Sequence, residues 1–137
     1  MLTYGDGVSD VDLSKLLAFH RAHGLVATVT AVAPTGRFGV LRLDDGSDKV
    51  AAFREKDKKD TGLINGGFFV CENGVFDVVD GDATVWEQEP MDRLVGAGQL
   101  AAYRHDGFWH AMDNVHDRTV LEQLWASGRA PWKVWQD

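Results

Sequence analysis

The chain has little of what a disulfide, a membrane span or a nucleic-acid surface would need. Its single cysteine, Cys71, excludes an internal disulfide and a metal site built from several cysteines. No apolar run approaches the roughly 20 residues of a membrane-spanning helix, and no basic and apolar leader is present. The formal net charge of −7 argues against an extended phosphate-backbone surface. We therefore expect a cytoplasmic protein that binds neither nucleic acid nor membrane.

What is present is typical of a globular α/β domain. The apolar share of 45% and the charged share of 26% are ordinary, and 137 residues fit one domain. Apolar residues recur at helical spacing in 11–23, where Ser9 or Asp10 could cap the start and Gly24 follows the end. The β-branched residues of 25–33 then predict a strand covered on both faces.

The remaining chain alternates between strand and helix patterns. Further predicted strands are 39–43, 50–54, 63–71 and 99–103, and the first two of these form a hairpin. Predicted helical segments are a short turn at 73–79, a helix at 84–95 with a capping box at Thr84 and Glu87, and a helix at 117–127. Two tryptophans near the end, Trp132 and Trp135, are expected to dock on this fold or on a neighbouring subunit.

Two carboxylates, distant in sequence, follow short apolar runs. Asp6 lies between two glycines at the end of a short apolar run from Leu2 that predicts a buried strand. Asp113 ends the aromatic and apolar run that begins at Gly107, so both acids are expected at strand ends. Since Mg²⁺ takes one or two carboxylates and fills its other positions with water and phosphate oxygens, these two could share one ion. The alternatives are a Gly-Asp turn at Asp6 and a helix cap at Asp113 or Asn114.

Three further motifs could bind a phosphorylated sugar. Glu55 could accept hydrogen bonds from hydroxyls and Lys56 could hold a phosphate, or the pair could be a solvated strand end. In Asn65-Gly66-Gly67, the amide suits polyol recognition, and the glycines mark either a β-bulge or the close approach of a ligand. In Arg37-Phe38-Gly39, the arginine could contact phosphate, or the segment could be a plain loop.

Six motifs follow one another along the chain. They are Tyr4-Gly5-Asp6-Gly7-Val8-Ser9-Asp10, Gly36-Arg37-Phe38-Gly39, Phe53-Arg54-Glu55-Lys56, Ile64-Asn65-Gly66-Gly67-Phe68-Phe69-Val70, Trp86-Glu87-Gln88-Glu89-Pro90 and Phe108-Trp109-His110-Ala111-Met112-Asp113. Their order resembles the C-terminal half of the glucose-1-phosphate cytidylyltransferase family of sugar-phosphate nucleotidyltransferases, over nearly the whole chain. The resemblance implies the C-terminal part of a Rossmann-like nucleotide-diphospho-sugar transferase fold with a mixed sheet.

The resemblance also implies an activity and a site. Such enzymes join CTP and α-D-glucose 1-phosphate into CDP-D-glucose and diphosphate, which supplies dideoxy sugars for O-antigen and related polysaccharides, and they are oligomers. The implied catalytic residues are Asp6, Lys56 and Asp113, of which Asp6 and Asp113 bind Mg²⁺. The implied substrate-binding residues are Arg37, Gly39, Glu55, Asn65, Gly66 and Trp109.

One departure from the family bears on activity. Family members have a strand leading into a Gly-rich loop with Gly-Thr-Arg, which cradles the triphosphate, and residues 1–137 contain no such sequence. We therefore expect a single truncated domain that is inactive alone. Two other functions stay open: a sugar-phosphate binding module without chemistry, and a nucleotide-sugar-dependent glycosyltransferase, which also holds a metal with an acid at a strand end.

Overall fold

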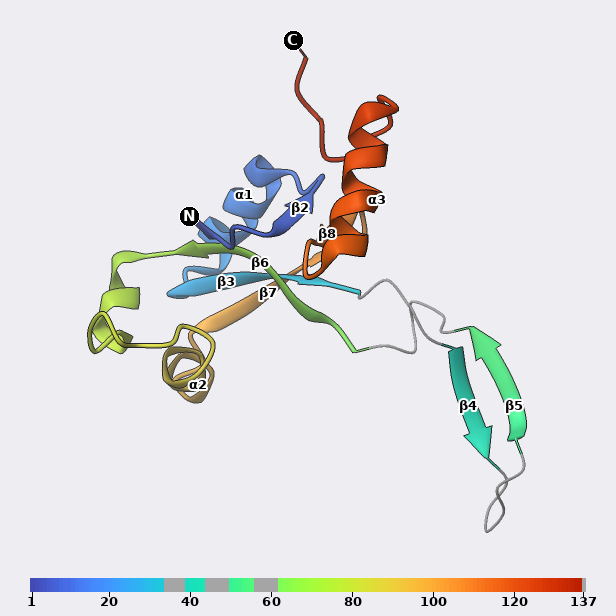
Figure 1. Ribbon diagram of the computed structural model, residues 1–137. Helices are drawn as coiled ribbons and strands as arrows, with labels where there is room; N and C mark the ends of the chain where they lie inside the picture. The colour runs from blue at the N-terminus through green and yellow to red at the C-terminus, as the bar shows by residue number, and fades with distance from the viewer. Residues whose placement is uncertain (34–38, 44–49, 56–61, 137) are drawn as a thin grey trace.

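A mixed four-stranded sheet forms the centre of the protein. The computed structural model shown in Figure 1 describes residues 1–33, 39–43, 50–55 and 62–136, and within 39–43 and 50–55 only the backbone. The sheet has the order β1-β6-β3-β7. Its strands are β1 (Leu2–Thr3), β6 (Ile64–Cys71), β3 (Ala27–Val32) and β7 (Leu100–His105). The β3–β7 pair is parallel, and the other two pairs are antiparallel, so the predicted α/β class with a mixed sheet is confirmed.

Two smaller ladders accompany this sheet. Strand β2 (Gly7–Ser9) pairs antiparallel with β8 (Trp109–Ala111) and so brings the N-terminal segment beside the segment that precedes the last helix. Strand β4 (Gly39–Leu43) pairs antiparallel with β5 (Val50–Glu55), which confirms the predicted hairpin. Figure 1 shows this hairpin standing away from the main sheet.

Helices cover both faces of the sheet. Figure 1 shows α1 (Leu13–His23) on one face and α2 (Glu89–Gly96) on the other, with α3 (Val115–Ala126) beside β8. A 3₁₀ segment, η1 (Asn73–Val78), follows β6 at the predicted position. In the described part of the chain, every helix is too short or too polar to span a bilayer.

The predicted first helix is confirmed, but its cap is a different residue. Asp12 is the N-cap and accepts from the backbone N–H groups of Ser14 and Lys15, while Gly24 ends α1 with a φ of 67°. The predicted caps, Ser9 and Asp10, instead bind the backbone of Phe108. Their side chains therefore hold the β7–β8 turn against the N-terminal segment.

The predicted helix at 84–95 begins five residues late. Helix α2 starts at Glu89 with Pro90 in its first turn. A helix starting at Thr84 would place Pro90 in its interior, where the ring displaces a carbonyl and one hydrogen bond is lost. Thr84 instead accepts from the backbone N–H of Gly81, so the proline overrides the capping-box pattern.

The C-terminal tryptophans dock on this chain. Trp132 stacks on Phe108 with ring centroids 5.5 Å apart, and Trp135 lies 6.2 Å from Trp125. Both rings thus contact the chain's own fold, while docking of the half-exposed Trp135 on a neighbouring subunit stays a prediction.

A directed hydrogen-bond chain links α1 to the buried strand β3. The N–H of Leu25 donates to Nδ1 of His23 (2.9 Å), so a neutral His23 carries its proton on Nε2 and donates to the Thr28 hydroxyl (2.7 Å). The Thr28 hydroxyl then donates to Nδ1 of buried His20 (2.8 Å), and Nε2 of His20 faces Glu72 at 3.3 Å. One hydroxyl thus satisfies two imidazoles.

Thr28→Val should lower the free energy of unfolding by about 2 kcal/mol, because it removes this hydroxyl and leaves two ring nitrogens unsatisfied. Urea denaturation would measure the change. Thr30→Val is the matched control, since Thr30 is as buried on the same strand but its hydroxyl has no partner among the described residues. That control should be neutral or stabilising. Equal losses for both variants would contradict the assigned network.

Candidate functional site

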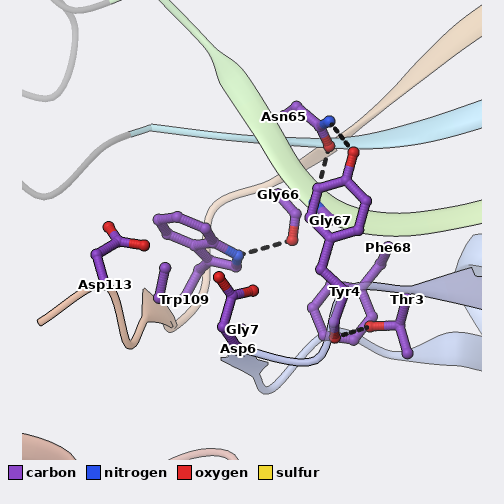
Figure 2. Close-up of a pocket in the computed structure, with 11 residues that line it drawn as sticks. Thr3, Tyr4, Asp6, Gly7, Asn65, Gly66, Gly67, Phe68, Trp109 and Asp113 are labelled. Atoms are coloured by element: carbon purple, nitrogen blue, oxygen red, sulfur yellow. Dashed lines mark hydrogen bonds between the residues drawn. The ribbon is translucent and has the colours of Figure 1, made fainter. Parts of the chain in front are cut away.

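An open cavity of about 190 Å³ lies where the segment after β1, the start of β6 and the end of β8 meet. Figure 2 shows the residues that line it. Five of the predicted site residues are among them: Asp6, Asn65, Gly66, Trp109 and Asp113. Residues that are up to 107 positions apart in sequence thus share one cavity.

Backbone pairing brings the two aspartates together. In the β2–β8 ladder Gly7 lies opposite Ala111, and the N–H of Met112 donates to the carbonyl of Asp6 at 2.8 Å. Asp6 therefore lies against the residue that precedes Asp113. The prediction that both acids end strands holds only for Asp113, which follows β8 closely, since β1 stops at Thr3. The antiparallel β2–β8 ladder joins the two acids.

Asn114, not Asp113, caps helix α3. Its side chain accepts from the backbone N–H of Asp117 at 3.0 Å. Of the two cap candidates in this segment, the structure selects Asn114, and the Asp113 side chain lines the cavity instead. Neither the Asp6 nor the Asp113 carboxylate forms a hydrogen bond or ion pair with another described residue.

The glycine pair forms a bulge whose residues line the cavity. The β3–β6 register shifts between Val29 and Ala31, whose partners are Phe69 and Asn65, so both glycines lie in the shifted stretch of β6. Gly67 has a φ of +77°, and a Cβ at this position would lie 2.9 Å from the ring of Tyr4. The bulge interpretation is confirmed, and the absence of side chains at the bulge lets Tyr4 pack against the strand.

The Asn65 amide is bound at both ends. Its oxygen accepts from the N–H of Gly67 at 2.8 Å, and its nitrogen donates to the Tyr4 hydroxyl at 2.9 Å. Burial raises the pKa of Tyr4 to about 12, and a hydrogen bond to the Glu87 carboxylate contributes in the same direction. Tyr4 is therefore a neutral hydroxyl near neutral pH.

Trp109 presents only its ring to the cavity. Its indole N–H donates to the carbonyl of Gly66 at 2.8 Å, as Figure 2 shows. That bond uses the ring's one donor, so Trp109 can contribute apolar area but no hydrogen bond to a ligand.

The donor set suits a hard divalent cation. Two carboxylates line one open cavity, which is the number that Mg²⁺ takes from proteins when phosphate and water fill its other positions. Within the described residues, no group of three or more His, Cys, Asp or Glu side chains could hold a metal.

Four predicted residues belong to the middle of the chain. Arg37 and Lys56 lie outside the described residues. Gly39 and Glu55 are opposite each other in the β4–β5 ladder, and only their backbone is described. Their relation to the cavity stays a prediction.

Sequence reasoning missed three residues of the site. Tyr4 and Gly67 line the cavity, although both stand inside motifs that the sequence analysis quoted. Asp117 is fully buried and accepts from the backbone N–H of Asp113 at 3.2 Å, and its other oxygen lies 3.5 Å from Nε2 of His110. An acid three residues after a helix cap was the available signal for Asp117.

Comparisons with known proteins identify related sequences and a related structure. A family model described as nucleotidyl transferase matches residues 1–116. A glucose-1-phosphate cytidylyltransferase of Salmonella typhi is 51% identical over 99% of the chain and 52% of its own length. A mannose-1-phosphate guanylyltransferase of Arabidopsis thaliana is 32% identical over 82% of the chain and 32% of its own length. The chain therefore spans about half the length, or less, of these curated relatives.

A solved structure shows the same fold. A protein of Bacillus anthracis assigned as a glucose-1-phosphate thymidylyltransferase superposes with a TM-score of 0.60 at 15% identity, over 97% of this chain and 55% of its own. The Rossmann-like nucleotide-sugar transferase fold implied by the motifs is thus confirmed.

Proposed function

Because the chain belongs to the nucleotidyl transferase family, we propose that it is the sugar-phosphate and metal-binding part of a glucose-1-phosphate cytidylyltransferase. The observation that carries the proposal is the shared cavity, where two unpaired carboxylates lie beside the oriented amide of Asn65. The whole enzyme would convert CTP and α-D-glucose 1-phosphate into CDP-D-glucose and diphosphate.

Each residue of the cavity has a distinct proposed task. Asp6 and Asp113 hold Mg²⁺, which neutralises phosphate charge when bound. Asn65 binds a sugar hydroxyl, the ring of Trp109 covers an apolar sugar face, and Gly66 allows close approach. Positioning of this kind brings the sugar phosphate oxygen in line with the α-phosphorus of CTP, where the bond to diphosphate breaks.

The residues of the middle segment complete the proposed site. Lys56 and Arg37 would bind phosphate as cations, while Glu55 accepts from sugar hydroxyls and Gly39 lies against the ring. The proposed location is the cytoplasm, and the proposed assembly is a homo-oligomer. Exposed apolar residues favour association: Leu2 of the edge strand β1 (41%) and Leu13 of α1 (49%) line one apolar surface cavity.

Metal binding tests the proposed carboxylate pair. Asp6→Asn should weaken Mn²⁺ binding, followed by electron paramagnetic resonance, at least about tenfold, because one of two anionic ligands is lost. Asp82→Asn is the matched control, since Asp82 is an exposed acid away from the cavity. Equal Mn²⁺ affinity for both variants would contradict the metal assignment.

Turnover separates the enzyme from the binding module. The 137 residues contain no Gly-x-Gly-Thr-Arg sequence, so diphosphate release from CTP and glucose 1-phosphate should stay at background for this chain alone. Binding without turnover is the module-like behaviour that we expect of the fragment. Robust turnover by the isolated chain, with mass spectrometry excluding a companion chain, would contradict that expectation.

A further inference from the structure

We propose that Tyr4 is a positioning residue that fixes the Asn65 amide, and so sets which hydroxyl of a hexose 1-phosphate the site requires. The inference rests on the proposed function and deepens it. The Asn65 side-chain nitrogen donates a hydrogen bond of 2.9 Å to the hydroxyl of Tyr4, which is 61 positions away in sequence, and both residues line the cavity.

The hydrogen bonds of Asn65 leave it one donor and one acceptor for a ligand. A primary amide has two N–H donors and an oxygen with two lone pairs. One N–H goes to Tyr4, and one lone pair accepts from Gly67. Exchange of the amide's nitrogen and oxygen would set an N–H against the N–H of Gly67, so the amide has one orientation. Its remaining groups match a single hydroxyl that both donates and accepts.

The Tyr4 ring is itself held by packing against Phe69 and Gly67. Its ring centroid is 5.8 Å from that of Phe69, and its other face occupies the space that a side chain on Gly67 would fill. Its hydroxyl oxygen accepts from the Asn65 nitrogen at 2.9 Å, since that nitrogen carries only donors. Because burial raises the pKa of Tyr4 to about 12, the hydroxyl keeps its proton throughout the physiological range.

Tyr4 and Asn65 therefore act as one unit. With Tyr4 unable to accept, the Asn65 nitrogen would lose its anchor while the oxygen kept its bond to Gly67. The amide could then rotate, and its hydrogen bonds would select less strongly for one particular hydroxyl. A site that hydrogen-bonds a hydroxyl binds the analogue lacking that hydroxyl more weakly. A loss of amide orientation should therefore reduce the ratio between the affinities for the sugar phosphate and for its deoxy analogue.

Tyr4→Phe tests the proposal, because it keeps the ring and removes only the hydroxyl. Calorimetry with glucose 1-phosphate and its 2-, 3-, 4- and 6-deoxy analogues gives one discrimination ratio per hydroxyl. We expect the variant to lose about tenfold in the ratio for one hydroxyl and to leave the others unchanged. Tyr103→Phe, at the chain's other tyrosine, is the control and should preserve every ratio. Unchanged ratios in Tyr4→Phe, or an equal fall in all, would overturn the proposal.

A second readout needs no ligand. In ¹⁵N NMR spectra of the free protein, the two Asn65 side-chain amide protons should have distinct shifts, with one moving and exchanging faster in Tyr4→Phe. Unchanged Asn65 resonances in that variant would overturn the positioning role. If the wild-type chain binds no glucose 1-phosphate, the proposed function fails, and these resonances still decide whether Tyr4 orients Asn65.

Discussion

Replacing Gly67 by alanine is expected to lower the free energy of unfolding by about 3 kcal/mol and to abolish sugar-phosphate binding. Two costs combine at this position. The φ of +77° is strained for any residue with a Cβ, and the added carbon would lie 2.9 Å from Cδ2 and 3.2 Å from Cγ of Tyr4. Tyr4 must then move away from the bulge, which breaks its hydrogen bond to Asn65.

A control separates these two costs. Gly98 has nearly the same φ, +66°, but a Cβ there would meet no atom within 4 Å. Gly98→Ala should therefore cost only about 1 kcal/mol and leave binding intact. Urea denaturation and calorimetry on both variants provide the comparison. Equal stability losses would mean that the packing of Tyr4 on Gly67 contributes nothing.

Asp117→Ala has the second large effect, a loss of about 3 kcal/mol in the free energy of unfolding. The Asp117 side chain is fully buried, so its removal leaves the N–H of Asp113 without its acceptor and Nε2 of the partly buried His110 without a facing carboxylate. Because the Asp113 backbone is then released, Mn²⁺ affinity should also fall about tenfold, as is typical when an outer-shell partner of a ligand is removed.

Asn114→Ala is the matched control for the helix cap. It removes the bond from Asn114 to the N–H of Asp117 but keeps the buried carboxylate, so we expect a loss of about 1 kcal/mol and nearly unchanged Mn²⁺ affinity. Thermal or urea unfolding and paramagnetic resonance would measure the two quantities. If Asp117→Ala behaved like Asn114→Ala in both, Asp117 would be only part of a helix cap.

Local patterns were enough to predict most of the elements. The spacing of apolar residues and the position of Gly24 predicted α1, and β-branched residues predicted β3 as a strand buried on both faces. The start of α2 was predicted wrongly because Thr84 and Glu87 match a capping box, whereas Pro90 belongs in the first turn. The capping-box pattern and the steric restriction on proline conflict there, and the proline decides where the helix begins.

The site could be predicted only as far as its residue types allow. Asp6, Asn65 and Asp113 were identified as candidates, since carboxylates and amides after short apolar runs suit metal and polyol binding. The roles of Tyr4 and Asp117 depend on partners that only the fold brings near them. The partner of Tyr4 is the Asn65 amide, 61 positions away, and the partner of Asp117 is the backbone N–H of Asp113. No local pattern specifies such contacts.

The most direct test of the central claim is a calorimetric titration of this chain with glucose 1-phosphate, with and without Mg²⁺, for wild type and Asp113→Asn. The account predicts saturable binding by the wild type that strengthens with Mg²⁺, and no such strengthening in the variant. No saturable binding by the wild type at millimolar sugar phosphate, or equal strengthening by Mg²⁺ in both proteins, would contradict it.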